Sequence, residues 1–159
     1  MRYYNAISKS YNELHKKEQL NKINIIKENI KPKKDEILLD VGCGTGISTS
    51  SFNCIKIGVD PSIKMLKQAK NAFYMKACAE KLPFKDRCFD YVISVTAVHN
   101  FKDIKKGLEE IKRVAKKDVV LSVMKRSSKF GEIEKRIISM FKVKKIIEEE
   151  KDIIFFLKR

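Results

Sequence analysis

The sequence predicts an α/β fold in which helices cover both faces of a mostly parallel sheet, with an antiparallel hairpin at the C-terminal end. Short apolar runs rich in β-branched residues alternate along the chain with stretches of helical periodicity, which is typical of a buried parallel sheet. The last two apolar runs are separated only by Glu150 and Lys151, and so short a link permits only antiparallel pairing.

Each element can be justified in order. Leu14, Leu20, Ile23, Ile26 and Ile30 recur at roughly helical spacing, and Lys31-Pro32 ends this first helix. The bounded apolar runs predict strands, and the periodic stretches between them predict helices. The expected strands are 36–42, 55–60, 72–77, 89–95, 118–124, 142–149 and 152–159, and the later helices are 61–71, 103–117 and 131–141.

Length and composition limit the organisation of the protein. The 159 residues are 43% apolar, which suits one continuous core, so we expect one domain over 1–159 with 1–31 as an N-terminal helical cap. No apolar run approaches the roughly 20 residues that span a bilayer, and the N-terminus lacks a signal-peptide core. The four cysteines are too scattered for a zinc site or a disulfide framework. We expect a soluble, cytoplasmic protein without a metal.

The net charge of +15 has two interpretations. Biased lysine and isoleucine usage would produce it without any polyanionic partner. However, such bias normally raises glutamate together with lysine, whereas here 35 basic residues face only 20 acidic ones. The excess favours a polyanionic partner, and RNA is the partner that we expect.

The loop after the first strand, in "EILLDVGCGTGIS", does not fit the common nucleotide motifs. Ile47 stands where a dinucleotide fingerprint needs its third glycine, and no Gly-Lys-Ser/Thr is present for a P-loop. Asp40 at the strand end would repel a pyrophosphate but attract an ammonium group. Asp60, at the end of the second strand, is placed to accept hydrogen bonds from two ribose hydroxyls. An ammonium group together with a ribose indicates S-adenosylmethionine.

Four linked motifs, "LLDVGCGTG", "GVDPSIKML", "AEKLPF" and "FDYVISVTAVHNF", occur in an order and spacing that resemble the class I S-adenosylmethionine-dependent methyltransferases. The resemblance runs from about Tyr4 to the C-terminus. It implies a doubly wound, seven-stranded sheet whose last strand is inserted antiparallel. It also implies a set of cofactor contacts. These are Asp40, Gly42, Gly44 and Gly46 around the methionine part, Asp60 on the ribose, Ile63 and Met65 near the adenine, Ala79 and Glu80 at the adenine edge, and Thr96 at the start of "TAVHN".

The sequence departs from the family at one of these positions, and competing interpretations remain for others. Cys78 stands where this subgroup commonly has an aspartate that accepts the adenine amino group. A glycine-rich turn alone could be a packing device, and Asp60 before Pro61 could simply cap the next helix.

Catalysis is harder to assign, because the sulfonium methyl group is already activated and the enzyme can work largely by alignment. His99 is the candidate base, although a packing role at a helix start competes with it. The resemblance implies that Tyr4 and Tyr11 belong to a leading aromatic segment that folds over the cofactor and substrate, and core packing competes here too.

We expect the acceptor to be a base in structured RNA, ribosomal or transfer RNA. The segment "MKRSSK", with Lys125, Arg126 and Lys129, follows the fifth strand and should lie where ligands enter open sheets. Two alternatives stay open: a small-molecule acceptor such as a quinone, and a catalytically silent cofactor-binding subunit. An activating protein subunit is also plausible, because "AFYM" is an apolar segment on an expected edge strand.

Overall fold

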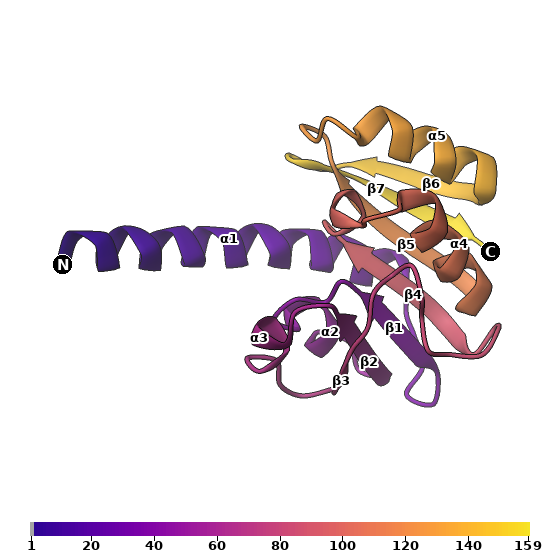
Figure 1. The fold of residues 1–159 in the computed structure, drawn as a ribbon, viewed down its shortest axis with the longest axis horizontal. Coiled ribbons are helices and arrows are strands. Elements are labelled where there is room, and N and C mark those ends of the chain that lie inside the picture. Colours follow the sequence, from indigo (N-terminus) through magenta and orange to yellow (C-terminus); the bar gives the residue numbers. More distant parts are fainter. Residues whose placement is uncertain (1) are drawn as a thin grey trace.

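The structure, a computed structural model, describes residues 2–159, with side chains described from residue 13 onward. In this range seven strands form one sheet in the order β3-β2-β1-β4-β5-β7-β6 (Figure 1). Strands β1 to β5 are parallel, whereas β7 runs antiparallel to both of its neighbours, β5 and β6. The predicted fold class is therefore confirmed. The strands are β1 (Ile37–Val41), β2 (Ile55–Asp60), β3 (Phe73–Lys76), β4 (Phe89–Val95), β5 (Ala115–Met124), β6 (Lys142–Glu148) and β7 (Asp152–Lys158).

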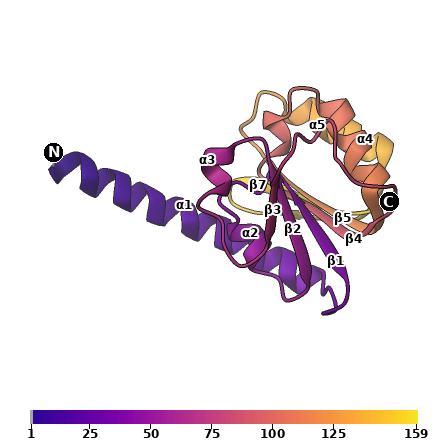
Figure 2. The same cartoon turned by 60° about the horizontal axis from the view of Figure 1, so that its bottom comes forward.

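Helices cover both faces of this sheet, as predicted. Helices α1 and α2 lie on one face and α4 and α5 on the other, while α3 lies beside the β2–β3 edge (Figure 2). The helices are α1 (Arg2–Asn29), α2 (Ile47–Ser50), α3 (Ile63–Leu66), α4 (Ile104–Val114) and α5 (Phe130–Met140), with a 3-10 turn η1 (Val98–Asn100) after β4. None of the helices that the structure describes is both long and apolar enough to cross a membrane.

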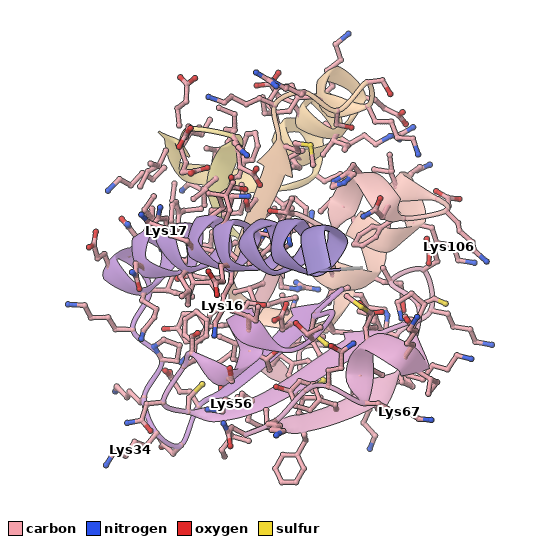
Figure 3. All side chains as sticks on the ribbon, turned by 90° about the vertical axis from the view of Figure 1, so that its left-hand side faces the viewer. Lys16, Lys17, Lys34, Lys56, Lys67 and Lys106 are labelled. Atoms are coloured by element: carbon pink, nitrogen blue, oxygen red, sulfur yellow. The ribbon has the colours of Figure 1, made fainter. Side chains whose placement is uncertain are left out.

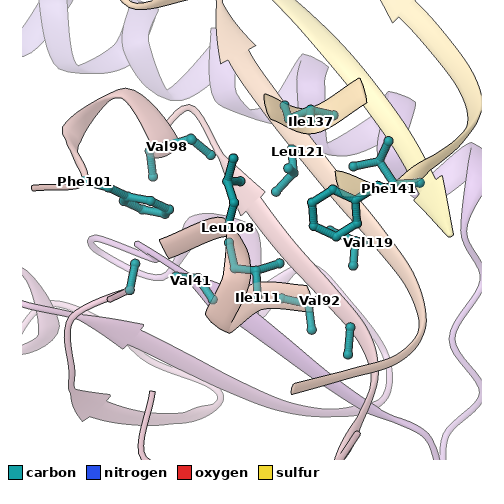
Figure 4. Close-up of a cluster of buried hydrophobic side chains, with 14 of the residues drawn as sticks. Val41, Val92, Val98, Phe101, Leu108, Ile111, Val119, Leu121, Ile137 and Phe141 are labelled. Atoms are coloured by element: carbon teal, nitrogen blue, oxygen red, sulfur yellow. The ribbon is translucent and has the colours of Figure 1, made fainter. Parts of the chain in front are cut away.

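The main core lies between the sheet and the α4–α5 layer (Figure 4). On α4, Ile104, Leu108 and Ile111 follow each other at four- and three-residue spacing, so their side chains share one buried face. That face packs on inward-pointing strand residues such as Val92 and Val119. A second core on the opposite face joins α1 to the sheet and so fixes the C-terminal half of that helix.

Helix α1 begins at Arg2, within the expected helical cap 1–31 but ahead of the apolar periodicity that starts at Leu14. Its N-terminal part projects beyond the sheet (Figures 1 and 2). Among the residues whose side chains are described, the buried apolar residues of α1 are Ile23 and Ile26 in its C-terminal half, and Ile30 directly follows the helix. The spacing of apolar residues that predicts the helix begins at Leu14, so it does not mark the first residue of the helix.

Two helix boundaries differ from prediction. The periodic stretch 61–71 forms only the single turn of α3, which Ser62 caps by accepting a hydrogen bond from the Met65 N–H (3.3 Å). The predicted helix 103–117 ends at Val114, because the next residues join β5 and pair with the start of β4. At the end of α4, strand pairing therefore overrides local helical periodicity.

Candidate functional site

A cavity of about 960 Å³ opens at the carboxyl edge of the parallel strands, beside the adjacent strands β1 and β4, whose following helices α2 and α4 lie on opposite faces of the sheet (Figure 2). Open α/β sheets bind ligands at such a switch point. The walls come from the loops after β1, β2, β3 and β4 and from α1. Among the predicted site residues, those lining the cavity are Gly42, Gly44, Asp60, Met65, Ala79, Glu80, Thr96 and His99.

Gly42 brings the β1 loop against the end of β4. Its φ is +76°, and its N–H donates a hydrogen bond to the Val59 carbonyl (2.8 Å). A Cβ atom at this position would lie 2.6 Å from the Cβ of Ala97, which is closer than real Cβ contacts. Glycine is therefore required both by the backbone angle and by the close approach, and the bare backbone keeps this wall of the cavity open.

Asp60 links the two loops that face the cavity from β1 and β2. Its Oδ2 accepts a hydrogen bond from the Gly44 N–H (2.9 Å), and its Oδ1 accepts one from the Ser62 N–H (2.8 Å). Each carboxylate oxygen can accept more than one hydrogen bond. The side chain therefore shapes the loop and keeps acceptor capacity for a ligand. The helix-cap alternative accounts for the Ser62 contact but not for the bond to Gly44.

Asp40 lies beneath the loop rather than in the cavity wall. It is fully buried, and its Oδ2 accepts hydrogen bonds from the hydroxyls of Ser48 and Thr49 at the start of α2. Its Oδ1 has no hydrogen-bond partner among the residues that the structure describes. Burial raises the pKa of this carboxyl to about 6, against the opposing effect of the two hydroxyl donors. Its observed contacts hold α2 against β1.

Four further predicted residues do not contribute described side chains to the cavity. Gly46 is buried, and a Cβ there would clash with the Tyr74 hydroxyl, so this glycine permits the packing of Tyr74 against the loop. Ile63 is exposed on α3 and does not line the cavity. The side chains of Tyr4 and Tyr11 lie outside the described residues.

Another wall of the cavity comes from the segment after β3. Ala79 is buried and Glu80 half-buried, and both line the cavity together with Cys78. The Oε1 of Glu80 accepts a hydrogen bond from the Asp103 N–H (3.2 Å), which ties this segment to the start of α4. The Cys78 thiol is at best a weak acceptor where a carboxylate was expected.

His99 and Thr96 line the other end of the cavity, after β4. The Nδ1 of His99 is buried without a hydrogen-bond partner in the described part of the chain. Burial lowers the pKa of this imidazole, and the charges of Lys129 and Lys22 act in the same direction while Asp152 opposes them. The neutral ring, the form that can accept a proton, is therefore favoured near neutral pH.

Sequence reasoning missed a third wall, which α1 supplies. His15, Lys16 and Gln19 line the cavity from this helix, and Lys102 lines it from the loop before α4. The stretch carries polar residues with no motif, so only the path of the helix reveals them. Figure 3 looks onto this face along α1 and shows Lys16 on the helix.

The basic segment after β5 is partly neutralised. Lys125 pairs with Glu148 (Nζ to Oε1, 3.0 Å), and the Lys129 ammonium donates to the His99 carbonyl (3.4 Å). Arg126 is exposed. Since Met124 lines the cavity, this segment does begin at the cavity, as predicted.

Comparison with known proteins agrees with this geometry. Residues 39–123 match the methyltransferase domain family. The uncharacterised protein MJ1252 of Methanocaldococcus jannaschii is 38% identical over 73% of this chain and 47% of its own length. The demethylmenaquinone methyltransferase of Corynebacterium kroppenstedtii is 33% identical over 64% of this chain and 47% of its own length.

Solved structures share the fold at lower identity. A methyltransferase from Aquifex aeolicus that depends on S-adenosylmethionine superposes with a TM-score of 0.71, at 19% identity, over 86% of this chain and 88% of its own. A complex of the Haloferax volcanii Trm112 methyltransferase activator with a protein assigned as a methyltransferase gives a TM-score of 0.66, at 14% identity, over 87% and 93%.

The chain spans about half the length of these curated relatives. The family match covers more than half of the chain, including the Gly42 loop, Asp60 and the segment through His99. The chain therefore belongs to the methyltransferase domain family, with the class I fold of the methyltransferases that use S-adenosylmethionine.

Proposed function

We propose that this protein transfers the methyl group of S-adenosylmethionine to a base in structured RNA. The observation that carries the proposal is the basic lining of the cavity, to which α1 contributes Lys16 and the loop before α4 contributes Lys102, while the exposed Arg126 lies two residues after the lining residue Met124. In the whole chain, basic residues also outnumber acidic ones, which gives a net charge of +15. Lysine and arginine at a pocket mouth attract phosphates and release counterions from RNA.

The cofactor would occupy the β1–β3 side of the cavity. We assign the methionine part to the backbone of Gly42 and Gly44, the ribose to Asp60, and the adenine to the side chain of Met65 and the segment at Ala79 and Glu80. When bound there, S-adenosylmethionine supplies an activated methyl group on a sulfonium. This chain's residues then have to orient an acceptor from the opposite end, near Thr96 and His99.

His99 is our candidate base. If it accepts the acceptor's proton, activity should fall as pH drops through its pKa, which burial places below the ordinary value of about 6.5. His99→Ala should lower turnover on total RNA by about 100-fold without changing the affinity for S-adenosylmethionine. A pH–rate profile with radiolabelled methyl donor tests this.

His15 offers the matched control, because the chain has only two histidines and both line the cavity. His15→Ala should keep the acid limb of the pH–rate profile, and His99→Ala should abolish it. A profile that is flat from pH 5 to 8 in the unmodified protein would instead give His99 a packing role.

RNA binding is tested by its salt dependence. The logarithm of RNA affinity should fall with the logarithm of salt concentration at a slope of roughly −0.7 to −0.9 per phosphate neutralised. Changing Lys16, Lys102 and Arg126 together to alanine should flatten that slope by about two to three. Filter binding with transfer RNA over a range of salt concentrations measures both slopes.

The control variant removes an equal number of positive charges at the opposite edge of the sheet, where three lysines are exposed: Lys34, Lys116 and Lys158. These three lie beside the start of β1, the start of β5 and the end of β7. Their replacement by alanine should leave the slope unchanged. Equal effects of the two triple variants would mean that RNA responds only to net charge, which contradicts a specific site.

A quinone-like acceptor is the second candidate, because the identity to the demethylmenaquinone methyltransferase favours it. The cavity also offers apolar side chains at its acceptor end, among them Val95, Phe101 and Met124. Methylation of a demethylmenaquinol by the purified protein, with none of total RNA, would select this alternative.

An activating subunit and a cytoplasmic location complete the proposal. Phe73 is 73% exposed on β3, an edge strand whose outer side has no partner strand in the described sheet. Such an edge can accept a strand from another protein, and the Haloferax complex supports an activator. The four cysteines are free thiols, which supports a reducing compartment.

A further inference from the structure

A buried ion pair joins α1 to the start of β7. Lys22 is 2% exposed and Asp152 is 0% exposed, and the Lys22 Nζ lies 2.9 Å from the Asp152 Oδ1. Lysine and aspartate are almost never fully buried unless they are paired. A buried pair of this kind adds little net stability compared with apolar residues, because desolvation offsets the attraction between the charges. Its position in the fold therefore calls for another explanation.

Two hydroxyl groups complete the network. The Lys22 ammonium donates to the Thr96 Oγ1 (3.1 Å), and the Thr96 hydroxyl donates to the Asp152 Oδ2 (2.7 Å). The Ser122 hydroxyl donates to the same carboxylate oxygen (2.5 Å). Four elements thus meet at one carboxylate: α1, the end of β4, β5 and β7.

The network holds Thr96 in a conformation that threonine rarely adopts. Its φ is +54°, in the left-handed region, which is unfavourable for a β-branched residue. Such strain persists only when the surroundings determine the conformation. Thr96 lines the cavity and begins the turn that carries His99, so its backbone angle decides where that turn points.

The same ion pair fixes the α1 wall of the cavity. His15, Gln19 and Lys22 are spaced by four and three residues, which places them on one face of α1. Lys22 lies against the sheet, whereas His15 and Gln19 continue along this face into the cavity wall. The ion pair therefore lies where the packed half of the helix meets the half that reaches over the cavity.

We propose that Lys22 and Asp152 are positioning residues for methyl transfer, which hold the α1 wall and the Thr96–His99 turn in register at the acceptor end of the cavity. The proposal rests on methyl transfer as the activity, but not on which acceptor is used. Neither side chain lines the cavity, so both act through Thr96 and through the helix.

The two histidines provide a direct probe, because one lies on each of the two walls. The double variant Lys22→Met/Asp152→Asn keeps the approximate shapes and the net charge while it removes the ion pair. In histidine-selective NMR spectra of this variant we expect the ring signals of both His15 and His99 to shift or broaden. Hydrogen exchange of the amides in 13–21 should also accelerate, by about tenfold.

The control is Lys151→Met, which removes the exposed pair between Lys151 and Glu18, a second link from α1 to the β6–β7 turn. It should leave the His99 signal unchanged, whereas the His15 signal is not part of this control because the Glu18 carboxylate acts on His15 directly. If the double variant does not fold, Asp152→Asn alone is used with the same readouts. A folded variant whose His15 signal and α1 exchange match the unmodified protein overturns the proposal, since the pair then serves stability alone. Both readouts are independent of the acceptor, so failure of the RNA proposal would leave this test unaffected.

Discussion

Replacing Lys22 alone with methionine should lower the free energy of unfolding by about 3–5 kcal/mol, which is the usual cost of leaving a buried charge without its partner. The Asp152 carboxylate would keep its hydrogen bonds from Thr96 and Ser122, but it would lose the ammonium group 2.9 Å away. It cannot reach water instead, because it is 0% exposed. Urea denaturation followed by circular dichroism measures the change.

Two comparisons make this prediction specific. The double variant Lys22→Met/Asp152→Asn should be clearly more stable than Lys22→Met, because it no longer buries an unpaired carboxylate. Lys151→Met removes a pair that is exposed to solvent and should change stability little. If Lys22→Met and Lys151→Met lower the free energy of unfolding equally little, the Asp152 carboxylate is solvated in solution and the buried pair stabilises the fold no more than the exposed one.

Much of the fold follows from local patterns. The strands are short apolar runs with clear boundaries, and the two-residue link at Glu150 and Lys151 by itself determined that β6 and β7 are antiparallel. Helix ends were less predictable. Val114 ends α4 because the following residues pair with β4, and no local signal marks that exchange of partners.

Part of the cavity lining could also be predicted from the sequence, because glycine-rich loops depend on backbone conformation. Gly42 and Gly44 both have positive φ and line the cavity. Asp60, at the end of β2, accepts a hydrogen bond from the Gly44 N–H in the same loop. Asp40 stands two residues before Gly42, yet its side chain points beneath the loop. Successive side chains of a strand point to opposite faces of the sheet. Because both faces of β1 are buried, the pattern of apolar residues does not show to which face Asp40 points.

The cavity wall near Thr96 could not be predicted, because the contacts that hold it come from distant segments. Lys22 lies in a lysine-rich helix in which most lysines are exposed, and Asp152 begins an apolar strand. Nothing in either local sequence indicates that the two are partners 130 residues apart. Likewise, the count of basic residues could not show that Lys125 already pairs with Glu148.

Asp60→Ala should weaken the binding of S-adenosylmethionine by roughly 2–4 kcal/mol, or about 30- to 1,000-fold. Alanine removes the proposed acceptor for two ribose hydroxyls, and charge-assisted hydrogen bonds are stronger than neutral ones. It also removes the acceptor of the Gly44 and Ser62 N–H groups, which frees the two loops that face the cavity. Isothermal titration calorimetry with S-adenosylmethionine measures the loss.

Asp90→Ala is the matched control for this measurement. The Asp90 carboxylate also accepts a hydrogen bond from a backbone N–H, that of Ile37 (2.9 Å), but it lies at the opposite edge of the sheet. Its removal should leave the cofactor affinity unchanged. Asp60→Asn should fall between Asp60→Ala and the unmodified protein, because the amide keeps one oxygen for the loop but no charge for the ribose. Unchanged affinity in a folded Asp60→Ala protein would mean that the carboxylate only shapes the loop, and the ribose would then need another partner in the cavity.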